Sequence, residues 1–160
     1  MRVRLEAASG APVFAYATLG STMDEAARLL GQGVPHGTCV IAASQTGGRG
    51  RLGRAWASPP GHLYLTQIWR LSCPADRAPS ATLEAGVAMA EAIEVSTGLR
   101  PTLKWPNDVQ LGGLKCAGIL ASLVSASLSG STVLIGVGLD VAPLGPEHEG
   151  LSATSLSDCL

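Results

Sequence analysis

Charged and aromatic side chains are scarce in this chain of 160 residues, at 14% and 4% of the composition. The formal net charge is −1, so the chain as a whole exerts no attraction on nucleic acid or on an anionic membrane. Any electrostatic function must therefore come from local clusters of charge. Hydrophobic residues reach 46%, which is typical of a folded globular protein. The length predicts a single domain over residues 1–160 with one substantial core.

Cysteine pairs and long apolar runs are also missing. The four cysteines are scattered without a C-x-x-C pair, and none of the three histidines lies at the spacing of a zinc site. The N-terminal segment lacks the apolar core of a secretory signal, and each apolar run stops short of the roughly 20 residues that a membrane helix needs. We therefore predict a cytoplasmic protein with reduced thiols and no membrane partner.

Two helices are predicted. Thr22 and Glu25 have the spacing of a capping box before the segment MDEAARLL, and Gly31 or Gly33 can end that helix. A second helix is predicted over residues 80–97 from its helical periodicity. Its apolar face carries Leu83, Gly86, Met89, Ala90 and Ile93.

Strands outnumber these helices. They are predicted over residues 37–44, 63–71, 102–105 and 131–141, and in a hairpin over residues 109–124 that turns at Gly112-Gly113. Because helices do not alternate strictly with strands, the order favours the α+β class, with a mixed sheet that carries helices mainly on one side. Residues 142–160 lose periodicity and are predicted to form a peripheral loop.

The sharpest feature is the loop of residues 45–61, where glycines alternate with Arg49, Arg51 and Arg54 before Trp56. Glycine lets a backbone approach a ligand closely and arginine supplies a bidentate charge, so the pattern favours a phosphate ligand. Two other interpretations stay open, a solvated flexible loop and an arginine-glycine contact to nucleic acid. The loop is neither a Walker loop nor a dinucleotide fingerprint.

A second cluster of polar residues interrupts the apolar segment of residues 103–120 and consists of Lys104, Asn107, Asp108 and Lys115. An unpaired lysine in an apolar strand is costly, so Lys115 either meets an anion or extends its ammonium to solvent from an edge strand. Asp108 is either a turn residue or a ligand for Mg²⁺.

Two glycines, Gly136 and Gly138, interrupt a later predicted strand. Glycine within a strand marks a bulge, or a place where a ligand or another backbone comes close.

Four segments occur in a fixed order: GRGRLGRAW at residues 48–56, KWPND at 104–108, KCAGIL at 115–120 and GVGLDV at 136–141. With an early Ser21-Thr22 and a late ATSL, they resemble the signature segments of biotin protein ligases over about residues 13–156. The resemblance implies a mixed sheet flanked by helices, related to the catalytic domain of class II aminoacyl-tRNA synthetases. It also implies that biotin is activated with ATP and Mg²⁺ and transferred to a lysine of a biotin carboxyl carrier protein.

The resemblance assigns roles residue by residue. The catalytic cations would be Lys115, Arg49 and Arg51. The biotin pocket would be lined by Ser21, Thr22, Gln45, Gly48, Arg49 and Gly118. ATP and the adenylate would contact Arg51, Arg54, Trp56, Lys104, Asn107, Asp108, Lys115 and Asp140, and Asp108 would also hold Mg²⁺.

The chain departs from the family pattern in three ways. Met23 and Asp140 stand where many members have asparagine. The family usually continues into a small SH3-like C-terminal domain, which we expect to be absent, and no DNA-binding helix-turn-helix is expected before residue 13. We therefore expect a short ligase that is a monomer or homodimer without a nucleic-acid partner. The alternatives are a non-catalytic or impaired module that binds biotin or its adenylate, and a lipoate ligase, whose R-R-x-x-G-G-G segment is not found here.

Overall fold

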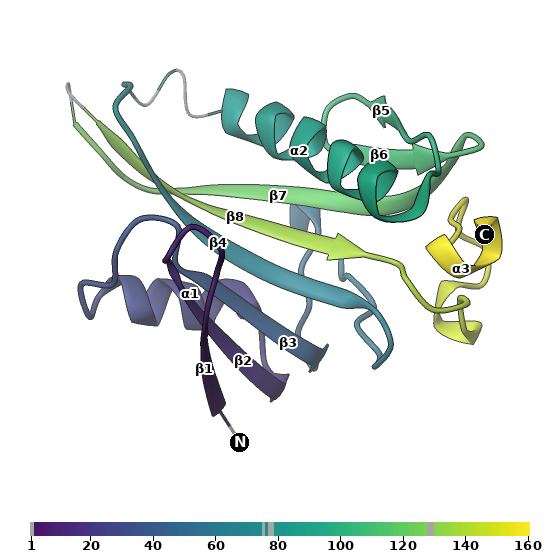
Figure 1. Ribbon diagram of the computed structural model, residues 1–160, viewed down its shortest axis with the longest axis horizontal. Helices are drawn as coiled ribbons and strands as arrows, with labels where there is room; N and C mark the ends of the chain where they lie inside the picture. The colour runs from purple at the N-terminus through teal and green to yellow at the C-terminus, as the bar shows by residue number, and fades with distance from the viewer. Residues whose placement is uncertain (1, 75, 77–78, 128–129) are drawn as a thin grey trace.

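An eight-stranded sheet forms the body of the protein in a computed structural model that describes residues 2–74, 76, 79–127 and 130–160 (Figure 1). The strand order is β1-β2-β3-β4-β8-β7-β6-β5, in which β2 and β3 are parallel and the other neighbours are antiparallel. This mixed sheet confirms the predicted α+β class. The strands are β1 (Arg2–Glu6), β2 (Pro12–Leu19), β3 (Cys39–Gln45), β4 (Leu63–Leu71), β5 (Thr102–Lys104), β6 (Asp108–Leu111), β7 (Leu114–Ala126) and β8 (Ser131–Leu139).

Helix α1 (Thr22–Leu30) connects the parallel strands β2 and β3. Ser21 is its N-cap, because the Ser21 hydroxyl accepts a hydrogen bond of 3.2 Å from the backbone N–H of Met23. The predicted capping box is therefore wrong by one residue, and Glu25 instead pairs with Arg28 at 2.7 Å. The buried side chains follow one helical face and are Thr22, Met23, Ala26 and Leu29.

Helix α2 (Ser80–Thr97) begins and ends at the predicted residues. The helix packs closely on the sheet at Gly86, where an added Cβ would lie 3.5 Å from Cδ1 of Ile119. Leu83 was expected on the same face as Gly86, and both residues line one shallow groove toward β5, although Leu83 is 42% exposed. The buried residues of the helix are Ala81, Ala85, Gly86 and Ile93.

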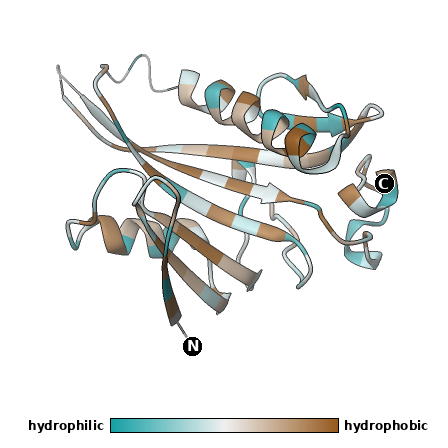
Figure 2. Ribbon diagram, in the orientation of Figure 1, coloured by the Kyte–Doolittle hydropathy of each residue, from teal (hydrophilic) through white to brown (hydrophobic). Residues whose placement is uncertain are grey.

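The two helices cover opposite faces of the sheet. In β8, Val133 and Ile135 belong to the core under α2, whereas Leu134 belongs to the core under α1. Successive side chains of a strand point to opposite faces, so the central strands are buried on both sides. The expectation of helices mainly on one side is therefore wrong, because apolar residues at both parities of β8 need cover on both faces. Figure 2 shows the hydrophobic colour along the central strands and both helices.

The C-terminal segment, residues 142–160, lies beyond the end of β8 and contains η3 (Pro146–His148) and α3 (Leu156–Cys159) (Figure 1). It was expected to be a peripheral loop, but part of it is built into the fold. Thr154 and Leu156 are buried, and the Thr154 amide donates a 2.8 Å hydrogen bond to the Lys115 carbonyl. The segment therefore supports the start of β7.

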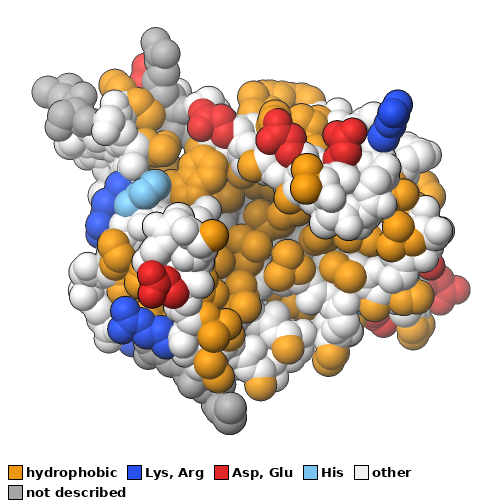
Figure 3. Space-filling view, in the orientation of Figure 1, with side chains coloured by type: hydrophobic (Ala, Val, Ile, Leu, Met, Phe, Trp, Pro, Cys, Tyr) orange, Lys and Arg blue, Asp and Glu red, His pale blue; other side chains and the backbone are white. Residues whose placement is uncertain are grey.

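The surface that carries α2 is largely apolar beside the helix and acidic along the outer edge of the helix (Figure 3). Leu63, Trp69 and Leu71 of β4 pack against the α2 core while remaining partly exposed. Among the described residues, no helix combines the length and the apolar character that crossing a bilayer requires.

Candidate functional site

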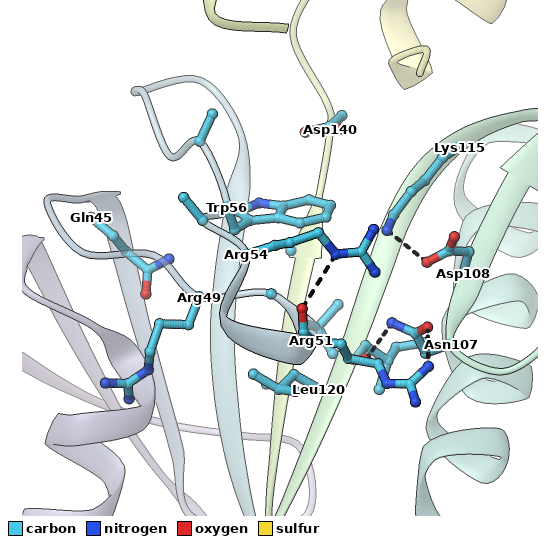
Figure 4. A pocket seen from close by; sticks show the side chains of 18 of the residues that line it. Gln45, Arg49, Arg51, Arg54, Trp56, Asn107, Asp108, Lys115, Leu120 and Asp140 are labelled. Atoms are coloured by element: carbon cyan, nitrogen blue, oxygen red, sulfur yellow. Dashed lines mark hydrogen bonds and ion pairs between the residues drawn. The ribbon is translucent and has the colours of Figure 1, made fainter. Parts of the chain in front are cut away.

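A cavity of about 300 Å³ opens on the α1 face of the sheet, beside the first residues of α1. The glycine-arginine loop, with its short helix η1 (Arg51–Gly53), encloses it together with β7, β8, the start of β6 and part of the C-terminal segment (Figure 4). The cavity brings together most residues that the sequence predicted as site residues. These are Ser21, Thr22, Gln45, Arg49, Arg51, Arg54, Trp56, Asn107, Asp108, Lys115, Gly118 and Asp140.

Glycines form the floor of this cavity. Gly118 of β7 and Gly138 of β8 are paired across the two strands, and the indole of Trp56 rests against both. A Cβ at Gly138 would lie 2.4 Å from Cε2 of Trp56, and one at Gly118 would lie 2.8 Å from Cζ3. Any larger residue would displace the indole. A bulge, a ligand or another backbone was expected at Gly138, but the group that lies against it in this structure is the side chain of Trp56.

Lys115 reaches the cavity from the β6–β7 hairpin, whose turn at Gly112 and Gly113 lies as predicted. Its Nζ lies 2.6 Å from Oδ1 of Asp108 and 5.0 Å from the ring centroid of Trp56. The ammonium is therefore held by an ion pair and by a cation–π contact. Lys115 thus pairs with a carboxylate of the protein itself instead of extending unpaired to solvent.

The three arginines of the loop face different ways. Arg51 donates from Nη1 to Oδ1 of Asn107 at 3.2 Å, and Arg54 donates from Nε to the Arg51 carbonyl at 3.3 Å, so both lie over the cavity (Figure 4). Arg49 points away from Lys115 and forms a bidentate pair with Asp24 of α1, with N–O distances of 2.6 and 3.1 Å. The guanidinium of Arg49 is therefore engaged by Asp24, although the residue itself lines the cavity.

The opposite end of the cavity is a neutral polar corner. Oε1 of Gln45, at the end of β3, accepts hydrogen bonds from the backbone N–H and the hydroxyl of Thr22, at 2.8 and 3.1 Å. Nε2 of Gln45 donates to the Ser58 hydroxyl at 3.0 Å. The amide of Gln45 is thus fixed between the start of α1 and the end of the loop.

Asp140 contributes a buried carboxyl group to the wall of the cavity. Its carboxyl is 2% exposed, and Oδ1 finds no hydrogen-bond partner among the described residues. Nδ1 of His62 and Nε2 of His148 each lie 3.8 Å from this oxygen, which is too far for a hydrogen bond. Burial raises the pKa of Asp140 to about 6, although nearby His148 and Lys115 oppose the rise. Burial, and next the charge of His148, also lower the pKa of His62.

Two predicted site residues do not line the cavity. Lys104 ends the edge strand β5, one strand farther out than Asp108, and its exposed side chain borders a separate shallow groove. Gly48 acts on the loop instead, because its carbonyl accepts from the Trp56 amide at 3.0 Å. A Cβ at Gly48 would lie 2.4 Å from the Trp56 carbonyl oxygen, so the two sides of the loop can pair at its base only if residue 48 is glycine.

The donor set limits how a metal ion can be held. Among the described residues, no three histidine, cysteine or carboxylate side chains come together as a metal site. Asp108 offers one carboxylate that is already paired with Lys115. This set does not fit a metal caged by protein, but it fits a Mg²⁺ ion that is held mostly by phosphates and water.

Several residues of the site were missed by the sequence analysis. His62 follows the loop and His148 lies in the C-terminal segment, and neither has a neighbour at metal-ligand spacing that would have marked it. Ser58 and Thr66 join the polar corner only through tertiary hydrogen bonds. A single sequence carries no local signal for such contacts.

The site is thus a cation-lined cavity under a glycine-arginine loop, on a mixed sheet with helices on both faces. The chain belongs to the Biotin/lipoate A/B protein ligase family, whose model matches residues 16–140.

Relatives of known name are a little over a third identical to this chain over the aligned segments. The bifunctional ligase/repressor BirA of Bacillus subtilis is 38% identical over 124 residues, which is 77% of this chain and 38% of that protein. The biotin–[acetyl-CoA-carboxylase] ligase of Mycobacterium tuberculosis is 36% identical over 127 residues, which is 76% of this chain and 46% of that protein. The chain thus spans half or less of the length of these relatives.

Solved structures agree with the fold over nearly the whole chain. The biotin protein ligase of Leishmania major in complex with biotinyl-5-AMP superposes with a TM-score of 0.78 at 26% identity, covering 92% of this chain and 64% of that one. The biotin protein ligase of Aquifex aeolicus in complex with biotin and ATP gives a TM-score of 0.75 at 31% identity, with coverage of 92% and 60%. The expected biotin protein ligase type of catalytic fold is confirmed.

Proposed function

We propose that this chain activates biotin with ATP to form biotinyl-5′-AMP and pyrophosphate, and then transfers biotin to a lysine of a biotin carboxyl carrier protein. The observation that carries the proposal is one cavity that has cations at one end and a neutral polar corner at the other. Lys115, Arg51 and Arg54 supply the positive charge. Gln45 and Thr22 supply donors and acceptors for an uncharged head group.

In the first step, a biotin carboxylate oxygen attacks the α-phosphorus of ATP and pyrophosphate leaves. Both reactants are anionic, so the step requires positive charge at the point of attack. We assign Lys115 to the carboxylate and the α-phosphate, and Arg51 and Arg54 to the remaining phosphates, because these three cations line the same cavity. A Mg²⁺ ion bound to the phosphates, with Asp108 as its protein ligand, would neutralise further charge.

In the second step, the amine of an acceptor lysine attacks the carbonyl carbon of the mixed anhydride, and AMP leaves. This step needs no serine or cysteine nucleophile, because the anhydride is already activated. The anhydride is labile to water, so a loop that covers it protects the intermediate. The contact of the Trp56 indole with the glycine floor of the cavity supports this covering role.

Biotin-dependent exchange between pyrophosphate and ATP tests the proposal. The chain should exchange labelled pyrophosphate into ATP when biotin is present, and should not do so with lipoate in its place. A biotin carboxyl carrier domain should then acquire biotin, detected with streptavidin. Exchange with lipoate but not biotin would identify a lipoate ligase. Binding of biotin without any exchange would identify a non-catalytic binding module.

A further inference from the structure

A chain of hydrogen bonds runs from the middle of the sheet to the polar corner of the cavity. The hydroxyl of Thr66, which is fully buried in β4, donates to Oγ1 of Thr22 at 2.9 Å. Thr22 donates in turn to Oε1 of Gln45 at 3.1 Å. Thr66 does not line the cavity, so it reaches the corner only through Thr22.

The direction of these bonds is fixed by chemistry. Oε1 of Gln45 also receives the backbone N–H of Thr22 at 2.8 Å, and a backbone N–H can only donate. The amide oxygen, not the amide nitrogen, must therefore face Thr22. At the other side of the amide, Nε2 donates to Ser58, whose hydroxyl proton is used by the Trp56 carbonyl at 3.0 Å.

This arrangement leaves one donor unused. The amide nitrogen of Gln45 has two protons, and Ser58 accepts one of them. The other finds no acceptor in the hydrogen bonds of the described residues, and Gln45 lines the cavity. The corner therefore offers an N–H donor, which suits a carbonyl oxygen on the ligand.

We propose that Thr66 is a positioning residue for the cyclic urea head group of the ligand. By donating to Thr22 it holds the Thr22 hydroxyl proton on Oε1 of Gln45, in addition to the hydrogen bond from the Thr22 backbone N–H, and this second bond restrains the amide whose free N–H is offered to the carbonyl oxygen of the urea. The proposal rests on the proposed function for the identity of the ligand, but the hydrogen-bond chain itself exists without ligand.

The test compares two threonines that are both fully buried. Thr66→Val removes the donor at nearly constant shape, and KM for biotin in the exchange reaction should rise about tenfold with kcat within twofold, the effect of one neutral hydrogen bond lost from binding. Thr66→Ser should restore KM to within about twofold. Thr38→Val is the matched control, because the Thr38 hydroxyl donates to the Pro35 carbonyl at 2.8 Å outside the cavity lining, and its KM should stay at the wild-type value.

A spectroscopic measurement tests the hydrogen-bond chain without ligand. The side-chain amide signals of Gln45 in a nitrogen–proton correlation spectrum should shift in Thr66→Val and remain in place in Thr38→Val. Unmoved Gln45 signals overturn the proposal, as does an unchanged KM in Thr66→Val. If Thr66→Val does not fold, Thr66→Cys replaces it, because a thiol is a weak donor and should give an intermediate KM. If wild type neither binds nor uses biotin, the proposed function fails, and the Gln45 signals still decide whether Thr66 positions the amide.

Discussion

Lys115 is the cation of the cavity that contacts both an acid and an aromatic ring, at 2.6 Å from Asp108 and 5.0 Å from the Trp56 ring centroid. Lys115→Ala should lower biotin-dependent exchange by a hundredfold or more, the rough cost of removing one preorganised electrostatic group. The melting curve should change little, since the ion pair is partly exposed. Lys104→Ala is the control, because Lys104 lies outside the cavity lining. Exchange at the wild-type rate in Lys115→Ala would remove this lysine from the mechanism.

Asp140 should make stability depend on pH in an unusual direction. Its pKa is about 6 in the folded protein and 3.8 in the reference state, so folding favours the protonated carboxyl. The stability that this group contributes is present below pH 4 and is lost as pH rises through 6. Asp140→Asn removes the buried charge and should raise the free energy of unfolding by up to about 3 kcal/mol at pH 8.

The gain in stability from Asp140→Asn should shrink between pH 6 and pH 4, as measured by denaturant unfolding at each pH. Glu94→Gln on the exposed side of α2 should show no such trend. A gain of equal size at pH 4 and pH 8 would mean that the Asp140 charge is not what costs stability.

At this scale the sequence predicted which residues meet but not how they are paired. The motifs identified the cations of the cavity, because glycine allows close approach to a ligand and arginine and lysine suit an anionic one. They could not show that Arg49 turns to Asp24, since the two residues lie 25 positions apart. They also could not separate Lys104 from the cavity, because its distance from the cavity depends on β5 being an edge strand.

The glycine-arginine loop is the element whose movement the proposed reaction requires. Its base is tied by hydrogen bonds from the Trp56 amide to Gly48 and from the Gly50 amide to the Arg54 carbonyl, while Leu52 at its tip is 89% exposed. Trypsin should cleave after the loop arginines in the free protein. Biotin with ATP should slow that cleavage, because only the fraction of protein without ligand is then cut. The rate should fall about a hundredfold at ligand concentrations a hundred times Kd.

Cleavage after Lys104, which ends β5 and lies exposed outside the cavity lining, is the internal reference in the same digests. Biotin alone should protect the loop less than both ligands together. If the loop arginines are cut at the same rate with and without ligands, the loop does not close over them.

The sequence predicted the central elements better than the outer ones. The bounds of α2 and β4 agree with the predicted ranges, because each has a clear period of helical or alternating apolar residues. No strand was predicted for β1 or β2, and β2 depends on parallel pairing with β3 across α1, which local sequence does not encode. The C-terminal segment lacks periodicity because backbone hydrogen bonds to Lys115 and Asp140 and one buried leucine, Leu156, hold it in place, and these contacts do not repeat along the sequence.

For the molecule as a whole, the proposed reaction requires that a reactive intermediate be kept inside. The adenylate retains one negative phosphate after pyrophosphate leaves, and Arg51 lies over the cavity on Asn107 at 3.2 Å. A charge-assisted hydrogen bond contributes roughly 1.5 to 3 kcal/mol, so Arg51→Ala should speed escape of biotinyl-5′-AMP by about ten- to a hundredfold. Biotin recognition should suffer less, because Gln45 and Thr22 lie at the other end of the cavity.

Because the chain has few lysines, its own labelling by escaped biotinyl-5′-AMP can be assigned to single residues. The sequence has two lysines, Lys104 outside the cavity lining and Lys115 within it. Escaped adenylate should therefore biotinylate the exposed Lys104 and the lysines of an unrelated bystander protein, which a streptavidin blot and peptide mass spectrometry would detect. Arg70→Ala, an exposed arginine outside the cavity lining, should label neither above the wild-type level. If Arg51→Ala still makes the adenylate while bystander and Lys104 labelling stay at the wild-type level, then Arg51 does not retain the intermediate.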